Sequence, residues 1–351
     1  MGLLAALAAG VALAGVSDTV PDGAQPTLTP DARTLVYVQN GRDGAQVVAR
    51  DRRTRRSAAV SVSSSGARAN ASSLDPAVSD DGRFVSFCSC ASNLAPRDEL
   101  VQTGFANRLD QFRDVFVRDR RARRTTRVSV GRGGAKPNGW SCHATISGNG
   151  RVVAFVSAAS NLVAGDGDGQ ANVFVHDRVT RRTTRLAGMA LDSSGAKPSL
   201  SRDGRWLAYS VGGSLFLRDL RTGRTTTVGS GGGAQISADG RRVAFTRGPP
   251  MRGHVYDRST RRTLDLGDAN AVRIAAGGRF VASHWHDRIT LHDLRGGGST
   301  RVDVPSFGGY GWSAAFVGGI SADARVISYV AQSSDGLPAG QHRQALVLRA
   351  R

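Results

Sequence analysis

The chain has 351 residues, of which 40% are hydrophobic and 21% are charged, so it can form a large core and is not a disordered chain. Its formal net charge of +19 comes almost entirely from arginine, since Lys136 and Lys197 are the only lysines. The arginines are spread along the chain without zinc-finger spacing, a helix-turn-helix pattern or an aromatic-rich basic strand, which argues against specific nucleic-acid recognition.

The first sixteen residues, MGLLAALAAGVALAGV, are uncharged and contain Ala12-Leu13-Ala14, a pattern typical of a signal-peptidase site before Gly15. The segment lacks a positive start and is too short for a confident membrane span. We interpret residues 1–14 as a signal peptide, intact or truncated, and expect residues 15–351 to form one domain. This predicts a secreted or cell-envelope protein, or a cytoplasmic one if the segment is not cleaved. No other segment is apolar enough to cross a bilayer.

A short polar cluster followed by an apolar strand recurs along the whole chain. Asp-Gly or Asn-Gly supplies the positive φ that a tight hairpin turn needs, and the following Val, Phe and Tyr favour a half-buried strand. Ala32 and Ala324 replace the glycine in the first and last copies, where we expect looser turns or another turn type. The seven copies are LTPDARTLVYV from Leu28, VSDDGRFVSFC from Val78, ISGNGRVVAFV from Ile146, LSRDGRWLAYS from Leu200, ISADGRRVAFT from Ile236, IAAGGRFVASH from Ile274 and ISADARVISYV from Ile320.

A second signature follows the first, as in DVFVRDRRARRTTRVSV from Asp114 and SLFLRDLRTGRTTTVGS from Ser214. Two short apolar strands flank an Asp-Arg-rich turn. Each unit therefore holds four strands, and seven such units without helical periodicity predict an all-β, seven-bladed β-propeller of four-stranded antiparallel blades. Strand order places the Asp-Gly turns and the arginine-rich turns on one rim and the long irregular loops on the other.

The pair SADGRRVAF and VFVRDRRARRTTRVSV resembles the TolB-like, WD-repeat-like β-propeller repeat, and related repeats occur in prolyl-oligopeptidase-type enzymes. The resemblance covers residues 16–351. It implies a rigid binding scaffold, often exported in bacteria, whose propeller usually carries no catalysis.

The seventh unit ends at QALVLRAR, residues 344–351, without a fourth strand. The N-terminal stretch ALAGVSDTVPDGAQPTLTPDAR parallels RLAGMALDSSGAKPSLSRDGR from Arg185. We therefore expect residues near Gly15 to Val20 to form the outer strand of the last blade, which removes an exposed sheet edge.

The long-loop rim is the expected contact surface, because loops held by a rigid scaffold commonly carry function. Ordinary loop packing explains its aromatic residues equally well. The residues that we expect to bind there are Phe105, Arg108, Asp110, Trp140, Tyr310 and Trp312. The expected partner is a protein or peptide, with an anionic polymer as an alternative, and we expect a monomer.

Two further patterns suggest sites. Asp166, Asp168 and Asn172 have a spacing similar to that of calcium loops, although the complete EF-hand pattern is missing and an ordinary Asp-Gly loop is the alternative. No other cofactor is expected. Cys142 could form a disulfide with Cys88 or Cys90 in an exported protein, the alternative being buried thiols.

No catalytic motif accompanies the repeats. GWSAA from Gly311 lacks the second glycine and the strand-to-helix context of a nucleophile elbow. The sequence therefore predicts a non-enzymatic exported scaffold that binds a protein, a peptide or an envelope polymer. The alternatives are a propeller enzyme of the lyase or hydrolase type, with its site at the central channel, and an electrostatic binder of an anionic polymer.

Overall fold

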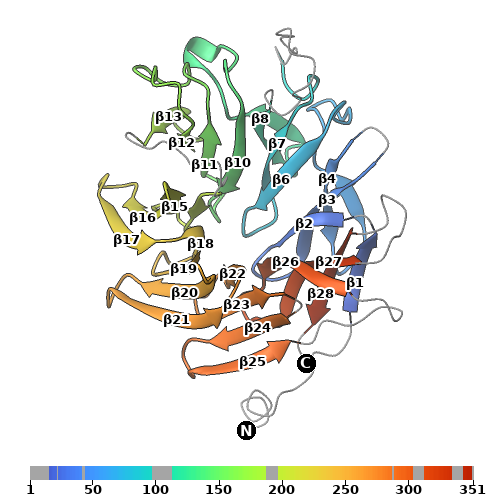
Figure 1. Cartoon of the computed structure of the whole chain (residues 1–351). Coiled ribbons are helices and arrows are strands. Elements are labelled where there is room, and N and C mark those ends of the chain that lie inside the picture. Colours follow the sequence, from blue (N-terminus) through green and yellow to red (C-terminus); the bar gives the residue numbers. More distant parts are fainter. Residues whose placement is uncertain are drawn as a thin grey trace.

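The computed structural model describes residues 16–21, 23–41, 44–96, 113–186, 197–286, 288–302, 312–333 and 343–349. Within these ranges the strands form seven four-stranded antiparallel sheets, and the short 3₁₀ helix η2 (Arg132–Gly134) lies between β9 and β10. The sheets are arranged around one axis like the blades of a propeller (Figure 1). The predicted all-β propeller of four-stranded antiparallel blades is confirmed. No helix of the described ranges is long and apolar enough to span a membrane.

We number the blades in chain order and give each from its inner strand outward. Blade 1 consists of β2 (Gly23–Leu28), β3 (Thr34–Gln39), β4 (Gln46–Asp51) and β5 (Ser57–Ala59), and blade 2 consists of β6 (Ser73–Val78), β7 (Phe84–Ser89), β8 (Asp114–Asp119) and β9 (Arg124–Arg127). Blade 3 consists of β10 (Ser141–Ile146), β11 (Val152–Ser157), β12 (Asn172–Asp177) and β13 (Arg182–Arg185). Blade 4 consists of β14 (Ser199–Leu200), β15 (Trp206–Val211), β16 (Ser214–Asp219) and β17 (Thr225–Ser230). Blade 5 consists of β18 (Gly232–Ile236), β19 (Arg242–Arg247), β20 (Arg252–Asp257) and β21 (Arg262–Asp268). Blade 6 consists of β22 (Ala271–Ile274), β23 (Phe280–Trp285), β24 (Arg288–Asp293) and β25 (Gly298–Val302). Blade 7 consists of β26 (Trp312–Ile320), β27 (Val326–Ser333), β28 (Arg343–Arg349) and β1 (Val16–Pro21).

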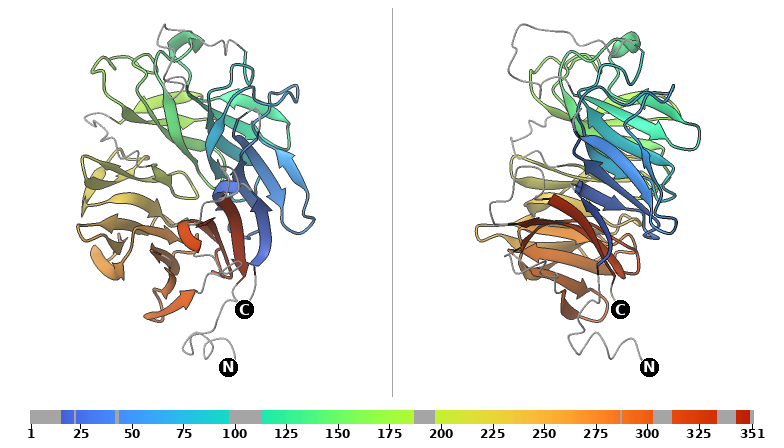
Figure 2. Two further views of the ribbon diagram at one scale, coloured as in Figure 1. Left: turned by 45° about the vertical axis from the view of Figure 1, so that its right-hand side comes forward. Right: turned by 90° about the vertical axis from the view of Figure 1, so that its right-hand side faces the viewer.

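The N-terminal strand β1 belongs to the same sheet as the last three strands. It pairs antiparallel with β28, from Val16 opposite Leu348 to Pro21 opposite Gln344. In Figures 1 and 2 the dark-blue start of the described chain lies beside the red end. Because β2 begins at Gly23, β1 leads directly from the last blade into the first.

Apolar side chains fill the space between neighbouring blades. One example is the cluster in which Phe87 and Phe116 of blade 2 meet Val36 and Val47 of blade 1. Val326 of blade 7 likewise packs with apolar residues of blade 1. Middle strands are therefore covered on both faces, which explains their nearly continuous apolar runs.

In six of the seven blades, a serine or threonine donates a hydrogen bond to an aspartate or asparagine two residues later in the first hairpin turn. In blade 5, Ser237 Oγ donates to Asp239 Oδ1 at 2.5 Å, and the amide of Gly240 donates to the Ser237 carbonyl at 2.9 Å. Gly240 has a φ of 69°, the left-handed conformation that glycine adopts without strain. The motif therefore encodes the turn through a serine, an aspartate and a glycine together.

The expectation of looser turns at Ala32 and Ala324 is wrong. These alanines have φ values of 56° and 57°, and their amides close the same turn at 2.8 and 3.0 Å. Thr29 Oγ1 donates to Asp31 Oδ1 at 2.5 Å, as the serine does in blade 5. The side-chain hydrogen bonds hold the turn shape even where an alanine bears a strain of about 1 kcal/mol.

Arginine and aspartate join the first and third turns of six blades, so both turns lie on the same rim, as the strand order predicts. In blade 2, Arg83 Nη2 lies 2.7 Å from Asp119 Oδ2, and Asp119 also accepts hydrogen bonds from the amides of Arg121 and Ala122. The six pairs are Arg33 with Asp51, Arg83 with Asp119, Arg151 with Asp177, Arg205 with Asp219, Arg241 with Asp257 and Arg279 with Asp293.

These contacts stabilise the ionised aspartates. The hydrogen bond from Arg279 outweighs the effect of burial and lowers the pKa of Asp293 to about 2, from an ordinary value of 3.8. Arg205 lowers the pKa of Asp219 to about 2 in the same way. A carboxyl group whose pKa is lower in the folded state stabilises the fold above its unfolded pKa, and this contribution is lost as the pH falls through its folded pKa.

We expect β1 to contribute to stability because it pairs along its whole length with β28. A chain that starts at residue 23 should unfold at a temperature roughly 5 °C or more below that of a chain that starts at residue 16. Differential scanning calorimetry measures both. A chain that lacks residues 350 and 351, which follow β28, is the control and should behave like its parent. Equal unfolding temperatures for the starts at 16 and 23 would show that β1 adds no stability.

We expect the Asp293→Asn variant to lose part of its stability at neutral pH. The free energy of unfolding at pH ~7 should fall by about 1–2 kcal/mol, because Arg279 is partly exposed and loses a charged partner. The decline of stability between pH ~4 and pH ~2 should become shallower. Urea denaturation over this pH range measures both, with Asp268→Asn, an exposed aspartate on β21, as the control. A pH dependence identical to that of the parent would refute the assigned role of Arg279 and Asp293.

Candidate functional site: the central cavity

A cavity of about 1180 Å³ lies where the inner strands converge, and residues of all seven blades line it. The lining comes mainly from the inner strands β2, β6, β10, β14, β18 and β22. Of these, β2, β6, β10, β18 and β22 are labelled around the axis in Figure 1. Its charged residues are Asp75, Lys197, Arg247 and Arg273. The described part of the lining therefore contains three cationic side chains and one carboxylate.

The inner strands of blades 1, 2, 3 and 5 contain a bulge at the same position, three residues before each repeat motif. The register between the inner strand and the second strand shifts there, for example between Leu74 and Ala77 in blade 2. The bulge residues have positive φ values of 48° at Gln25, 55° at Asp75, 51° at His143 and 63° at Gly233. Bulges redirect side chains, and a positive φ at a residue other than glycine stores strain.

Side chains at these positions form a network across four blades. The amide of Asp75 donates to Gln25 Oε1 at 2.8 Å, and His143 Nδ1 lies 2.9 Å from Asp75 Oδ2. Lys197, which precedes β14, occupies the same position relative to its motif. Its Nζ donates to the carbonyl oxygens of Asp75 and Pro76 at 3.2 and 3.1 Å. Asp75 of blade 2 is thus contacted from blades 1, 3 and 4.

The network shifts the pKa values of its charged groups. Burial alone would raise the pKa of Asp75, but the hydrogen bond from His143 and the charge of Lys197 lower it to about 2. Burial lowers the pKa of the Lys197 ammonium, which the charge of Asp75 partly offsets and the charge of Arg273 reinforces. Asp75 is therefore a carboxylate at neutral pH, while Lys197 gives up its proton more readily than an exposed lysine.

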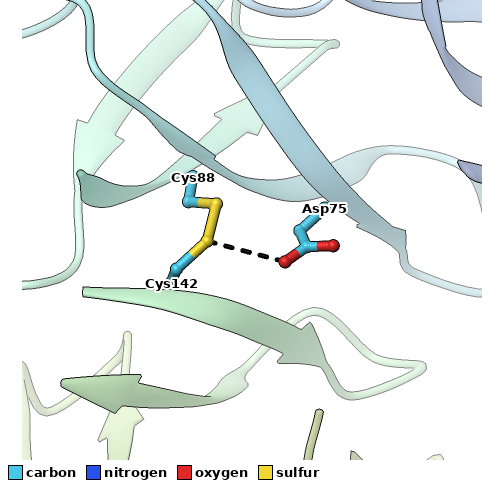
Figure 3. A group of neighbouring side chains, drawn as sticks. All are labelled: Asp75, Cys88 and Cys142. Carbon is cyan, nitrogen blue, oxygen red and sulfur yellow. Dashed lines mark hydrogen bonds between the residues drawn. A yellow bond between two sulfur atoms is a disulfide. The ribbon is translucent and has the colours of Figure 1, made fainter. Parts of the chain in front are cut away.

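Cys88 of β7 and Cys142 of β10 form a disulfide that joins blades 2 and 3 beside this network (Figure 3). Both residues are buried. Cys142 Sγ lies 3.5 Å from Asp75 Oδ2. Neither a disulfide sulfur nor a carboxylate oxygen carries a proton, so this is a packing contact. Of the two pairings expected from the sequence, the structure has Cys88 with Cys142, and Cys90 is outside the disulfide.

Comparisons with known proteins agree with this architecture. No family and no curated protein matches the chain. TolB from Acinetobacter baumannii superposes with a TM-score of 0.50 at 14% identity, over 79% of this chain and 65% of the TolB chain. The fold is that of a TolB-like β-propeller. An oligogalacturonate lyase in complex with manganese has a TM-score of 0.57 at 12% identity, over 95% of this chain and 91% of its own.

A second oligogalacturonate lyase, from Vibrio parahaemolyticus, has a TM-score of 0.59 at 8% identity and covers 96% of this chain and 92% of its own. At such identities the similarity shows the fold alone. The chain spans about 65% of the length of the TolB chain that it matches.

Most residues expected to bind on the long-loop rim lie outside the described residues. These are Phe105, Arg108, Asp110 and Tyr310. The backbone of Trp312 is described and pairs with Ser333 at the start of β26. Trp140 is described completely, and its ring meets that of His143 edge to face, with 6.5 Å between centroids. Trp140 is therefore next to the central network.

The three residues with a calcium-like spacing, Asp166, Asp168 and Asn172, lie close together, but the two aspartates bind Arg185. Arg185 Nη1 lies 2.5 Å from Asp166 Oδ1 and 3.0 Å from Asp168 Oδ2. Asn172 Nδ2 is directed at the same two carboxylates, at 3.5 and 3.4 Å. A guanidinium already bridges the oxygens that a calcium ion would need, so the contacts favour the ordinary Asp-Gly loop.

Sequence reasoning missed the central residues Gln25, Asp75, His143, Lys197 and Arg273. A signal for three of them is present, because Gln25, Asp75 and Lys197 each precede a proline at the same distance from a repeat motif. The inner strand is a sheet edge whose axial side has no partner strand, so a proline without an N–H group is tolerated there. A polar residue before such a proline therefore marks a position near the axis.

We expect thiol alkylation of the unfolded, unreduced protein to modify Cys90 but not Cys88 or Cys142. Peptide mass spectrometry measures the labelling. Substitution of Cys142 by alanine should lower the free energy of unfolding by about 2–4 kcal/mol, since the disulfide closes a long loop. The matched control is Cys90→Ala, which should have a smaller effect. Labelling of Cys142 in protein purified from an oxidising compartment would contradict the assigned pairing.

Proposed function

We propose that this protein is a non-enzymatic binding protein whose ligand site is the central cavity and whose ligand is a small molecule. The observation that supports this most strongly is the convergence of Gln25, Asp75, His143 and Lys197 from four blades at equivalent positions. Three of these residues have a strained backbone. Strain of about 1–3 kcal/mol per residue persists where a surrounding structure holds it, typically at functional sites.

The cavity has the size and composition of a ligand site. Its volume of about 1180 Å³ is at or above the upper end of the usual range for small-molecule pockets. Small residues such as Ser199, Ser230 and Gly232 line it beside a few charged groups. Such a mixture leaves space for a ligand while the charged groups orient it.

The arginine-rich rim offers less free charge than the composition suggests. Six of its arginines are paired with aspartates of the third turns, from Arg33 with Asp51 to Arg279 with Asp293. This counts against an electrostatic binder of an anionic polymer as the main function. The long-loop rim stays a prediction as a protein or peptide surface, because most of its expected residues are outside the described ranges.

In this proposal the ring has seven blades, β1 holds the last blade to the first, and a monomer contains the complete cavity. Export to the cell envelope fits the disulfide between Cys88 and Cys142. A propeller enzyme acting in the same cavity is the second candidate. The observation that favours it is the pair of Asp75 and His143 beside Lys197, whose pKa is lowered.

We expect a ligand of the cavity to be excluded by a bulky side chain at its wall. Ser230→Trp places an indole at an exposed lining position at the end of β17. Thr226→Trp, on the same strand but outside the lining, is the matched control. Thermal unfolding is measured with a panel of neutral sugars, amino acids, organic acids, sugar phosphates and polyamines.

At least one class should raise the unfolding temperature of the parent and of Thr226→Trp, but not that of Ser230→Trp. A shift of a few degrees is expected at saturating ligand. If no class stabilises the parent, or if both variants respond alike, the cavity is not the ligand site.

A further inference from the structure

We propose that the ligand of the central cavity carries an oxyanion group, a carboxylate or a phosphate, which Arg273 and Lys197 bind together. This inference rests on the proposed function, because it names the ligand class of that same cavity.

The fold does not require an arginine at position 273. The equivalent residue, immediately before the repeat motif, pairs with the second strand in every blade. The residues at this position are Thr27, Ala77, Thr145, Ser199, Gln235, Arg273 and Gly319. Six blades fold with a small or neutral residue there. Arg273 is thus an exception that packing and pairing do not explain.

The guanidinium of Arg273 is incompletely bonded. Its Nη1 donates to the carbonyl of Val272 at 2.9 Å. Its Nε is buried and has no hydrogen-bond partner among the described residues. Burial lowers the pKa of Arg273, and no carboxylate among the described residues offsets this effect. A buried donor without a partner is costly, so the guanidinium of Arg273 lacks part of its acceptor set among the described residues.

Lys197 places a second cation in the same cavity. Its Nζ uses two of its three hydrogens on the carbonyls of Asp75 and Pro76. The charge of Arg273 acts unfavourably on Lys197, so the two cations repel each other. The one lining carboxylate, Asp75, already accepts from His143. An anion between Arg273 and Lys197 would relieve this repulsion.

The geometry of the donors indicates the class of ligand. A guanidinium presents a planar edge that matches two oxygens of a carboxylate or a phosphate, while an ammonium adds one further donor. The volume of the cavity exceeds that of a simple ion, so the oxyanion is one group of a larger molecule. A neutral ligand would leave the charge of Arg273 uncompensated.

Isothermal titration calorimetry with citrate and with inorganic phosphate tests this inference, with sucrose and spermidine as neutral and cationic probes. We expect citrate, phosphate or both to bind, and sucrose and spermidine not to bind. If both bind, phosphate should compete with citrate, because they share one site. The relative affinities of the two anions distinguish a carboxylate from a phosphate ligand.

The Arg273→Met and Lys197→Gln variants should each weaken anion binding at least about tenfold. Without ligand, Arg273→Met should unfold at the same or a higher temperature than the parent, because a buried, uncompensated charge is removed. A structural arginine would give the opposite change. Arg262→Gln, an exposed arginine on β21, is the control and should bind like the parent.

The outcomes separate this inference from the proposed function. Anion binding that is equal in the parent, Arg273→Met and Lys197→Gln would overturn the inference. So would binding of sucrose or spermidine that Ser230→Trp abolishes, although the cavity would remain the ligand site. If Arg273→Met fails to fold, the anion affinity of Lys197→Gln and the competition between the two anions still test the inference.

Discussion

Seven inner strands converge on one axis, and within the described ranges none of them pairs with a strand on its axial side. Each inner strand is therefore a sheet edge with backbone groups that its own blade cannot pair. The chain meets this constraint with bulges in the inner strands of five blades and with prolines at positions 26, 76 and 198. The bulges direct side chains away from the regular alternation, and the space between the seven strands becomes a cavity.

The two ends of the repeat motif have different roles. At the rim, the same turn residues recur from blade to blade and satisfy one another, as Arg83 and Asp119 do in blade 2. Near the axis, equivalent positions differ, with Gln25, Asp75 and Lys197 in three blades and Gly233 in another. Repetition fixes the scaffold, whereas the positions free of turn chemistry can specialise. This division explains how a chain of similar blades has one asymmetric, charged site.

The fold could be predicted because its turns are encoded locally. Asp239 and Gly240 identify a hairpin from a few residues, and seven such hairpins define the class of fold. The turns at Ala32 and Ala324 were misjudged because the prediction considered the glycine and not the hydrogen bond from the neighbouring threonine or serine. The pairing of Cys142 needed the structure, since Cys88 and Cys90 are two residues apart in one strand region.

The central site could not be predicted, because it depends on distances across the ring. Asp75 and Lys197 are 122 residues apart in the sequence and meet only when blade 2 and blade 4 are placed around the axis. The polar residue before a proline is a local signal, but no local feature shows that it faces other blades. Arg273 belongs to no sequence motif. Its position stands out as a candidate binding position only when the register of the seven inner strands is compared.

A crystal structure with selenate tests the central claim most directly, because selenium scatters anomalously and selenate imitates an oxyanion group. The account predicts an anomalous peak in the central cavity, with oxygens within hydrogen-bond distance of the Arg273 guanidinium and of Lys197 Nζ. Peaks confined to the arginine-rich rim, with none in the cavity, would contradict it.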